Sequence, residues 1–394
     1  MIAQTDIHIV IENLSSISAA YSEGVAGRVL QEVWRRFDAA LGSKTWHCEE
    51  EAWGVSLRLI GDAPGDHLLE EVEAAVHTVS LHPIAVDSVR LVVALGYWDE
   101  EKFGEQTGTK DLDVARYRLD MSAAAFAYNA LAAGEIPFAE QPIVAASDRE
   151  RVLYCECLIR LPDGGGGAIM PGSFMPSIER LGLTRALDRC VVREALMQLR
   201  CRPQAVLGCN ISGLSACNDL WWRSTINELR QTPDLAQRLV IEMTETALPP
   251  DPSDALDCLA AFKASGCRVA LDDFGAGMSS ITFARSLRPD IIKIDGLYVR
   301  DAVALASAEE LLASLVAMTS CLADQVVVEG IEDERAVAAT LSAGGRWLQG
   351  YFVGRPGISA EARLPDSPAA RQPAVLAASA RRRACFGNRR RDSL

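Results

Sequence analysis

Residues 268–275 read Arg268-Val-Ala-Leu-Asp-Asp-Phe-Gly275. A short apolar run ends here in two aspartates and is soon followed by a glycine, which predicts a buried strand that leads into a polar turn. The pattern recurs to either side, with strands predicted at 153–161, 205–211, 239–243, 291–294 and 326–328. Helical stretches separate these strands, most clearly at 174–199 and 309–322. Such a βα repeat over roughly 220 residues predicts a (β/α)8 barrel, whose functional site lies at the carboxyl ends of the strands.

The part of the chain before this repeat is also of the α/β class. Strands are predicted at 7–11, 53–59 and 89–95, and helices at 25–41 and 119–133. Helix-stop chemistry at 132–137 marks a domain junction. A chain of 394 residues is long enough for two domains, which are predicted at 1–135 and 138–360. Residues 361–394 are rich in Ala, Pro and Arg and are predicted to form a disordered tail.

Composition excludes several classes of function. The formal net charge of −14 argues against general nucleic-acid binding, because a polyanion needs a basic surface. The five histidines all lie within the first 82 residues, at His8, His47, His67, His77 and His82. The C-terminal part therefore has no histidine for a Ser-His-Asp triad or a zinc site, and its chemistry must use carboxylates, Asn and Lys.

The expected location is the cytoplasm. The chain has no run of eighteen apolar residues and no basic, then apolar, N-terminus, so neither a transmembrane segment nor a signal peptide is predicted. Its eleven cysteines are an odd number and are scattered from Cys48 to Cys385. They are interpreted as reduced, mostly buried thiols.

Polar residues interrupt the predicted barrel strands or follow their ends. They are Glu156, Asn210, Glu242, Asp272, Asp273, Lys293, Glu329 and Gln349. A barrel would bring them to one rim, where five carboxylates would repel one another unless divalent cations neutralised them. Oxygen ligands without His or Cys favour Mg²⁺ or Mn²⁺. Two such ions, about 3.5–4 Å apart, suit phosphodiester cleavage, and Asp272 is the expected bridge between them.

Seven motifs occur in an order that resembles the EAL family of cyclic di-GMP phosphodiesterases. They are Tyr154-Cys-Glu-Cys-Leu-Ile-Arg160, Cys209-Asn-Ile-Ser212, Ile241-Glu-Met-Thr-Glu-Thr246, Leu271-Asp-Asp-Phe-Gly-Ala-Gly-Met-Ser-Ser280, Ile292-Lys-Ile-Asp295, Val328-Glu-Gly-Ile-Glu332 and Leu348-Gln-Gly-Tyr351. The resemblance implies a TIM-like barrel that hydrolyses cyclic di-GMP to linear pGpG and forms a homodimer. The name motif departs from the family at Cys157, which replaces Ala. On an alternating strand Cys157 points away from the face of Glu156, so a small apolar residue is tolerated there.

The resemblance also implies a role for each matching position. The metal ligands are Glu156, Asn210, Glu242, Asp272, Asp273 and Glu329. Lys293 contacts the attacking water, Glu245 fixes the metal-site loop, and Lys293, Glu245 and Glu329 make up the catalytic set. Gln141, Arg160 and Gln349 are the expected substrate-binding residues.

The first 135 residues resemble the GGDEF domain that often precedes an EAL domain, but without its functional residues. Where a Gly-Gly-Asp-Glu-Phe hairpin would bind GTP, this chain has His47-Cys-Glu-Glu-Glu-Ala-Trp53, which has no glycine to let the backbone approach a phosphate. The triple Glu49-Glu-Glu51 is expected to be a solvated loop. The domain is therefore interpreted as a non-cyclase with a regulatory or dimerising role.

Two other classes of function stay open. Relatives that have lost metal ligands act as cyclic di-GMP receptors, whereas no ligand position is replaced here. A scaffold that signals through protein contacts is suggested only by the degenerate first domain.

Overall fold

The computed structural model describes residues 6–41, 46–60, 65–98, 112–134, 137–162, 167–244, 249, 251–276 and 281–358. The predicted tail, 361–394, lies outside these residues, as does Glu245. In the described part, no helix combines the length and the apolar character that a membrane crossing requires.

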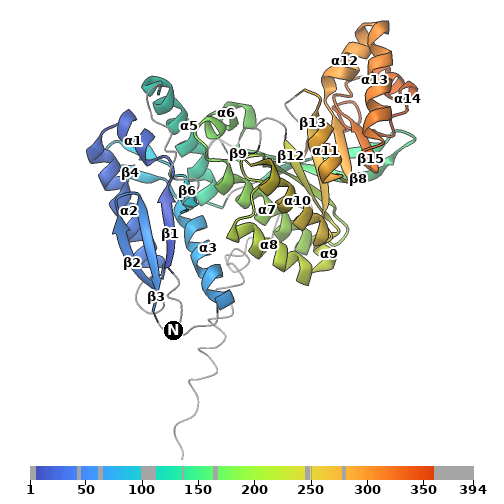
Figure 1. Ribbon diagram of the computed structural model, residues 1–394. Coiled ribbons are helices and arrows are strands. Elements are labelled where there is room, and N and C mark those ends of the chain that lie inside the picture. The colour runs from blue at the N-terminus through green and yellow to red at the C-terminus, as the bar shows by residue number, and fades with distance from the viewer. Residues whose placement is uncertain are drawn as a thin grey trace, which may run out of the picture. The chain divides into compact units, whose positions relative to one another are not determined.

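The N-terminal region is an α/β unit (Figure 1). Its antiparallel sheet has the order β2-β3-β1-β6, from β1 (Asp6–Ile11), β2 (Trp46–Glu51), β3 (Gly54–Leu59) and β6 (Leu95–Tyr97). A second antiparallel pair joins β4 (Ile84–Val86) to β5 (Val89–Leu91). The single strand predicted at 89–95 is therefore two strands, β5 and β6, which belong to different sheets. The helices are α1 (Leu14–Ala20), α2 (Glu23–Leu41), α3 (Gly65–Leu81) and α5 (Val114–Ala132).

The expectation of a solvated loop at Glu49–Glu51 is wrong, because these residues belong to β2. Glu49 pairs with Ser56 of β3, and Glu51 pairs with Gly54. The inward-facing residues of β2, Trp46 and Cys48, are buried, whereas the glutamates are at least partly exposed. Burial of alternate residues therefore outweighs the charge of the glutamate run and fixes it as an edge strand.

The C-terminal region forms a closed eight-strand barrel. Its strands are β7 (Phe138–Ala145), β8 (Asp148–Ile159), β11 (Leu207–Ser212), β12 (Leu239–Thr244), β13 (Arg268–Phe274), β14 (Ile291–Ile294), β15 (Gln325–Val328) and β16 (Trp347–Leu348). β7 is antiparallel to both β8 and β16, so the barrel is mixed rather than the fully parallel (β/α)8 barrel that was expected. The two-residue connection between β7 and β8 is too short for a crossover and permits only a hairpin.

Helices and short elements connect the barrel strands. They are β9 (Leu161–Pro162), β10 (Ala168–Ile169), η1 (Pro171–Ser173), α6 (Met175–Arg180), α7 (Thr184–Cys201), α8 (Leu220–Gln231), α9 (Pro233–Ala236), α10 (Pro252–Ala264), α11 (Ile281–Leu287), α12 (Gly296–Ala304), α13 (Ala306–Thr319) and α14 (Glu334–Ser342). The helix predicted at 174–199 is two helices. Gly182 separates them with a φ of 67°, a left-handed conformation that ends α6 and that glycine adopts without strain.

One cluster of buried apolar side chains extends from the N-terminal sheet into the barrel. It includes Ile9 of β1, Phe37 of α2 and Tyr128 of α5, and continues through Leu187 of α7 to Ile241 of β12. The hydroxyl of Tyr128 donates a hydrogen bond to the carbonyl oxygen of Leu183, directly before α7. The N-terminal region and α7 therefore pack against each other through a shared core.

Candidate metal centre

The polar side chains singled out in the sequence lie at one end of the barrel. Glu156 is on β8, Asn210 on β11, Glu242 on β12 and Lys293 on β14, while Glu329 directly follows β15. All five strands run parallel to one another, so their carboxyl ends meet at the same rim. The structure thus brings these residues together as the strand pattern predicts.

Lys293 occupies the centre of the group and is completely buried. Its Nζ atom lies 2.7 Å from Asp272 Oδ1, 2.9 Å from both Glu242 Oε2 and Glu329 Oε1, and 3.1 Å from Glu156 Oε2. Four carboxylates thus surround one ammonium group, and the excess of negative charge is a strong electrostatic attraction for divalent cations.

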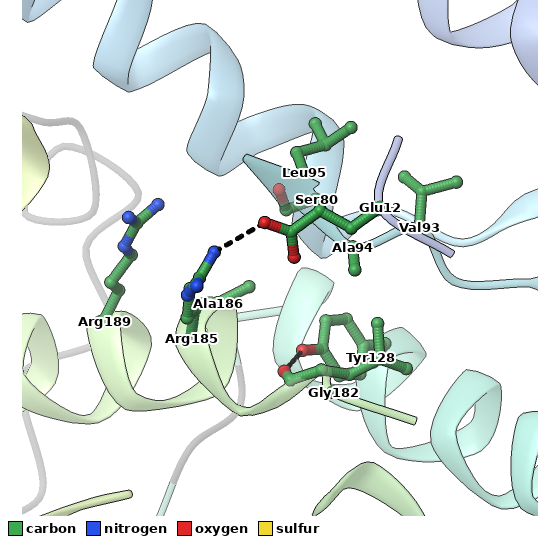
Figure 2. A pocket seen from close by; sticks show the side chains of 11 residues that line it. Glu12, Ser80, Val93, Ala94, Leu95, Tyr128, Gly182, Arg185, Ala186 and Arg189 are labelled. Atoms are coloured by element: carbon green, nitrogen blue, oxygen red, sulfur yellow. Dashed lines mark hydrogen bonds and ion pairs between the residues drawn. The ribbon is translucent and has the colours of Figure 1, made fainter. Parts of the chain in front are cut away.

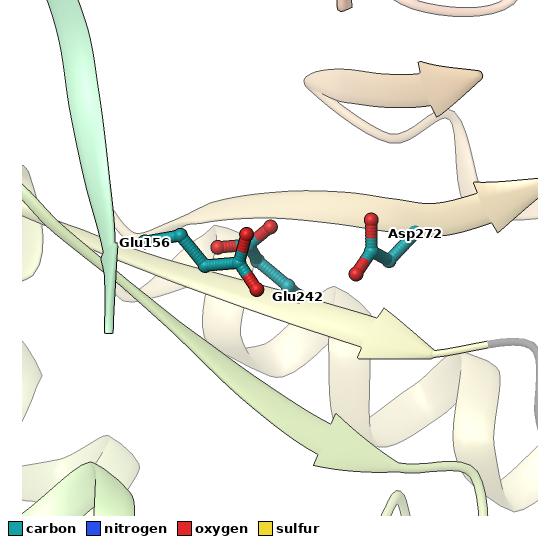
Figure 3. A group of neighbouring side chains, drawn as sticks. All are labelled: Glu156, Glu242 and Asp272. Atoms are coloured by element: carbon teal, nitrogen blue, oxygen red, sulfur yellow. The ribbon is translucent and has the colours of Figure 1, made fainter. Parts of the chain in front are cut away.

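The carboxylates fall into two groups that share one residue. Oxygen atoms of Glu156, Glu242 and Asp272 lie within 4.8 Å of one another, and so do those of Asp272, Asp273 and Glu329. Figure 3 shows the first group, in which the three side chains come from β8, β12 and β13. Asp272 is therefore placed to contribute to two adjacent cation sites.

A local backbone distortion lets two consecutive aspartates serve the same centre. Neighbouring residues on a strand normally point to opposite faces. Asp273, however, has a φ of 53°, and the pairing of β13 with β14 shifts register between Leu271 and Phe274. A non-glycine residue in the left-handed region is strained, and such strain is characteristic of functional sites.

Amide side chains contact Glu156 from two sides. Asn210 Nδ2 donates to Glu156 Oε1 at 2.6 Å, and Gln349 Nε2 donates to Glu156 Oε2 at 2.5 Å. Among the buried atoms that the structure describes, Asn210 Oδ1 and Glu242 Oε1 have no hydrogen-bond partner. Buried acceptors without donors are costly, so these two oxygens fit the requirements of a hard cation such as Mg²⁺ or Mn²⁺.

The fully buried Glu242 has two local supports that the sequence did not reveal. The hydroxyl of Tyr154 donates to Glu242 Oε2 at 3.1 Å. Gly208 of β11 leaves room for both side chains, since a Cβ there would lie 2.1 Å from Glu242 Oε1 and 2.5 Å from Tyr154 Cε2. Tyr154 stands two residues before Glu156, on the same face of β8, and this spacing was the available signal.

The pKa values of the group reflect burial and mutual repulsion. Burial raises the pKa of Glu242 to about 8, although Lys293 opposes the shift. Burial and the charge of Asp272 raise the pKa of Asp273 to about 7. Burial also opposes the charge of Lys293, but the surrounding carboxylates outweigh it and raise the pKa of its ammonium well above its ordinary value. Lys293 is thus a fixed positive charge rather than a free base.

The expected substrate residues lie beside this centre. Gln349 Nε2 is 3.4 Å from Gln141 Oε1, and Gln141 Nε2 donates to the carbonyl of Gly354 at 3.0 Å. Arg160, directly after β8, is buried and donates to the carbonyl of Ile159 at 2.9 Å. Burial lowers the pKa of Arg160, while the nearby Tyr351 and Glu156 oppose that shift. The side chains of Gln141, Arg160 and Gln349 form a polar border to the carboxylate cluster.

Comparison with known proteins agrees with this geometry. The family model described as the EAL domain matches residues 126–356, which contain the whole cluster. The chain belongs to the EAL domain family. The match begins at Phe126, so the region before it carries no family assignment.

Curated relatives match the chain at moderate identity. The cyclic di-GMP phosphodiesterase PdeF of Escherichia coli is 29% identical over 208 residues, which is 52% of this chain and 28% of PdeF. The cyclic di-GMP phosphodiesterase PdeB of Shewanella oneidensis is 27% identical over 220 residues, which is 54% of this chain and 25% of PdeB. The chain thus matches only about a quarter of the length of these relatives.

Solved structures share the fold. A phosphodiesterase described as PaMucR in complex with c-di-GMP is 26% identical, has a TM-score of 0.54, and covers 61% of this chain and 99% of its own. A Vibrio cholerae LapD fragment described as S helix-GGDEF-EAL is 14% identical with a TM-score of 0.54, and covers 88% of both chains. At this identity the second likeness shows the fold alone.

Proposed function

We propose that this chain hydrolyses cyclic di-GMP to linear pGpG with two divalent cations, Mg²⁺ or Mn²⁺. The observation that carries the proposal is the pair of three-carboxylate groups that share Asp272 around Lys293. Membership of the EAL family and the activity named for PdeF and PdeB support it. Bound cations would supply Lewis acidity and an activated water for attack on a phosphodiester.

Each residue of the cluster is assigned a role in holding the cations or the attacking water. Glu156, Asn210, Glu242 and Asp272 would hold one cation, and Asp272, Asp273 and Glu329 the other. Lys293 remains protonated, orients the attacking water and stabilises the negative charge that develops on the phosphoryl oxygens. Glu329, whose Oε1 atom lies 2.9 Å from Lys293 Nζ, would help to hold the same water. Glu245, outside the described residues, is retained as the residue that fixes the metal-site loop.

Substrate contacts are assigned to Gln141, Arg160 and Gln349. The guanidinium of Arg160 suits a phosphate, because it presents several donors in one plane. The amides of Gln141 and Gln349 can each offer both a donor and an acceptor to a guanine edge. Gln349 has a second task, since it also orients Glu156.

We further propose that residues 1–135 form a degenerate GGDEF-like regulatory domain and residues 138–360 the catalytic domain. The β2–β3 hairpin turns at Ala52 and Trp53, where no glycine allows close approach of a phosphate. A homodimer is the expected assembly, and light scattering on the purified chain would test it.

The deciding experiment incubates the purified chain with cyclic di-GMP and Mn²⁺ and follows pGpG by chromatography. The matched variants are Asp272→Asn, which is expected to be inactive, and Glu334→Gln, an exposed acid on α14 that is expected to behave as wild type. Binding of cyclic di-GMP without formation of pGpG would indicate that the chain is a receptor instead of an enzyme. The absence of both binding and product would favour a scaffold that signals through protein contacts.

A further inference from the structure

Helix α7 contacts the N-terminal region through Arg185 and Cys190. Arg185 Nη1 donates to Glu12 Oε1 at 2.9 Å, and Figure 2 shows this ion pair in a small pocket that Tyr128 and Gly182 also line. Further along α7, Cys190 Sγ lies 3.8 Å from Nε2 of the buried His77 on α3. Arg185 and Cys190 are about one and a half turns apart, so the two contacts come from different sides of α7.

The same helix also contacts the loop that follows β11. Asp188 Oδ2 accepts hydrogen bonds from the backbone N–H of Ser212 at 2.8 Å and from Ser215 Oγ at 2.5 Å. Arg185 Nε donates to the carbonyl of Leu214 at 3.4 Å. Asp188 and Ser215 are buried, so these bonds exclude water and fix the loop against α7.

Ser212 is the last residue of β11 and stands two positions after Asn210. The position of Asn210 matters because its Nδ2 atom donates to Glu156 while its buried Oδ1 atom has no partner among the described residues. A shift of the 212–215 loop would therefore move an amide that contacts Glu156, a member of the first carboxylate group.

We propose that α7 couples the N-terminal region to the metal centre, with Asp188 as the positioning residue for Asn210 and the Glu12–Arg185 ion pair as the link. The inference rests on the proposed metal centre, but it concerns cation affinity and does not require hydrolysis. It predicts that a change in the N-terminal region alters how tightly the barrel binds a divalent cation.

The two contacts differ in expected strength. The bonds of Asp188 are buried and directed at backbone and hydroxyl donors, so their loss should act strongly on Asn210. Arg185 and Glu12 have side chains that are 32% and 35% exposed, so solvent weakens their ion pair and its effect should be smaller.

The experiment measures Mn²⁺ affinity of the full chain by the paramagnetic resonance signal of free Mn²⁺. Asp188→Asn is expected to weaken binding about tenfold, the lower end for residues that orient a ligand indirectly. Glu12→Gln is expected to weaken it about threefold. The double variant should bind like Asp188→Asn alone, because the Glu12 effect must pass through α7.

Asp87→Asn is the matched control, since it breaks an ion pair with Arg28 inside the N-terminal region, at 2.6 Å, away from α7. It should leave Mn²⁺ affinity unchanged. If Asp188→Asn folds poorly, Glu12→Gln and Arg185→Gln carry the test, with melting temperatures recorded in parallel.

A Glu12→Gln chain that is less stable but binds Mn²⁺ as tightly as wild type would overturn the proposal, as would strictly additive effects in the double variant. Wild-type chain that binds Mn²⁺ without hydrolysing cyclic di-GMP would refute the proposed function and leave this inference testable as described. Wild-type chain that does not bind Mn²⁺ would overturn both.

Discussion

The ammonium group of Lys293 lies 2.7 Å from Asp272, the aspartate that both carboxylate groups share. In the absence of cations this contact, with those to Glu156, Glu242 and Glu329, partly neutralises a buried acidic cluster. Lys293 would therefore have two separable effects, one on the stability of the cation-free protein and one on the proposed reaction.

Replacing Lys293 with Met keeps most of the side-chain length and removes the charge. We expect kcat to fall by at least about a hundredfold, the scale of losing one positioned electrostatic contact. Binding of cyclic di-GMP in Ca²⁺, measured by calorimetry, should be largely retained because the variant keeps the phosphate contacts that are proposed for Arg160 and the cations. Complete loss of binding would instead make Lys293 a substrate anchor. Lys263→Met, which removes an ion pair with Asp290 outside the barrel centre, is the control.

The shared position of Asp272 predicts different cation stoichiometries in two variants. Asp272→Asn should lose both Mn²⁺ ions and at least about a hundredfold in kcat, because it removes a charged ligand from each group. Glu329→Gln should lose only one ion, since Glu329 belongs to one group. Equilibrium dialysis with Mn²⁺ distinguishes the two, and equal stoichiometry in both variants would contradict the sharing of Asp272.

Gly208→Ala tests the packing beneath Glu242. The added Cβ would lie 2.1 Å from Glu242 Oε1, so Glu242 or Tyr154 must move. We expect a loss of about 1–3 kcal/mol in the free energy of unfolding, as for an overpacked core, together with weaker Mn²⁺ binding. The control is Gly27→Ala on α2, where a Cβ meets nothing within 4 Å. Unchanged Mn²⁺ affinity in Gly208→Ala would show that Glu242 does not depend on this space.

Glu73 of α3 predicts a pH dependence of stability. Burial raises the pKa of Glu73 to about 7, although Arg189 and a hydrogen bond from Tyr97 oppose the shift. Below about 4.5 the carboxyl is protonated in both the folded and the unfolded chain, so it contributes no pH dependence. Between about 4.5 and about 7 only the folded chain keeps the proton, so stability falls as pH rises through this window.

The measurement is the free energy of unfolding in denaturant at pH 5 and pH 8. Glu73→Gln should reduce the difference between the two pH values by about 1–3 kcal/mol, because the amide does not titrate. Glu71→Gln, exposed on the same helix, is the control. An identical pH dependence in wild type and Glu73→Gln would refute the prediction.

The N-terminal region should not make cyclic di-GMP. The Asp272→Asn variant of the chain, which is expected not to hydrolyse the product, is the sensitive form for this assay. Incubated with GTP and Mg²⁺, it should yield no cyclic di-GMP, because the β2–β3 turn at Ala52 and Trp53 lacks phosphate-binding glycines. Product above a no-protein blank would restore a cyclase role to this region.

The sequence predicted the central barrel strands well because their residues are buried on both faces. The stretches around Ile241 and Ile292 are short apolar runs that end in charged residues, and both are strands as expected. β7 and β16 were missed. β7 contains Pro142 and two polar residues, and β16 has only two residues, so neither shows a clear strand pattern.

The candidate site shows a similar division. The strand-end positions of Glu156, Glu242 and Lys293 follow from the barrel pattern. The convergence of Asp272 and Asp273 does not, because it depends on the left-handed φ of Asp273 and a register shift that alternation alone would not allow. The contact of Asp188 with Ser212 joins a helix to a strand end, and no local sequence pattern reports it.

The hairpin of β7 and β8 also determines where the chain enters the barrel. Because β7 runs against its neighbours, its first residue, Phe138, pairs with Ile159 at the end of β8. The preceding Pro137 accepts a hydrogen bond from the backbone N–H of Arg160 at 3.0 Å. A pull or twist on the polypeptide arriving at Pro137 would thus be transmitted directly to Arg160, at the end of β8. A fusion or insertion placed just upstream of this point would apply force to the polar border of the carboxylate cluster.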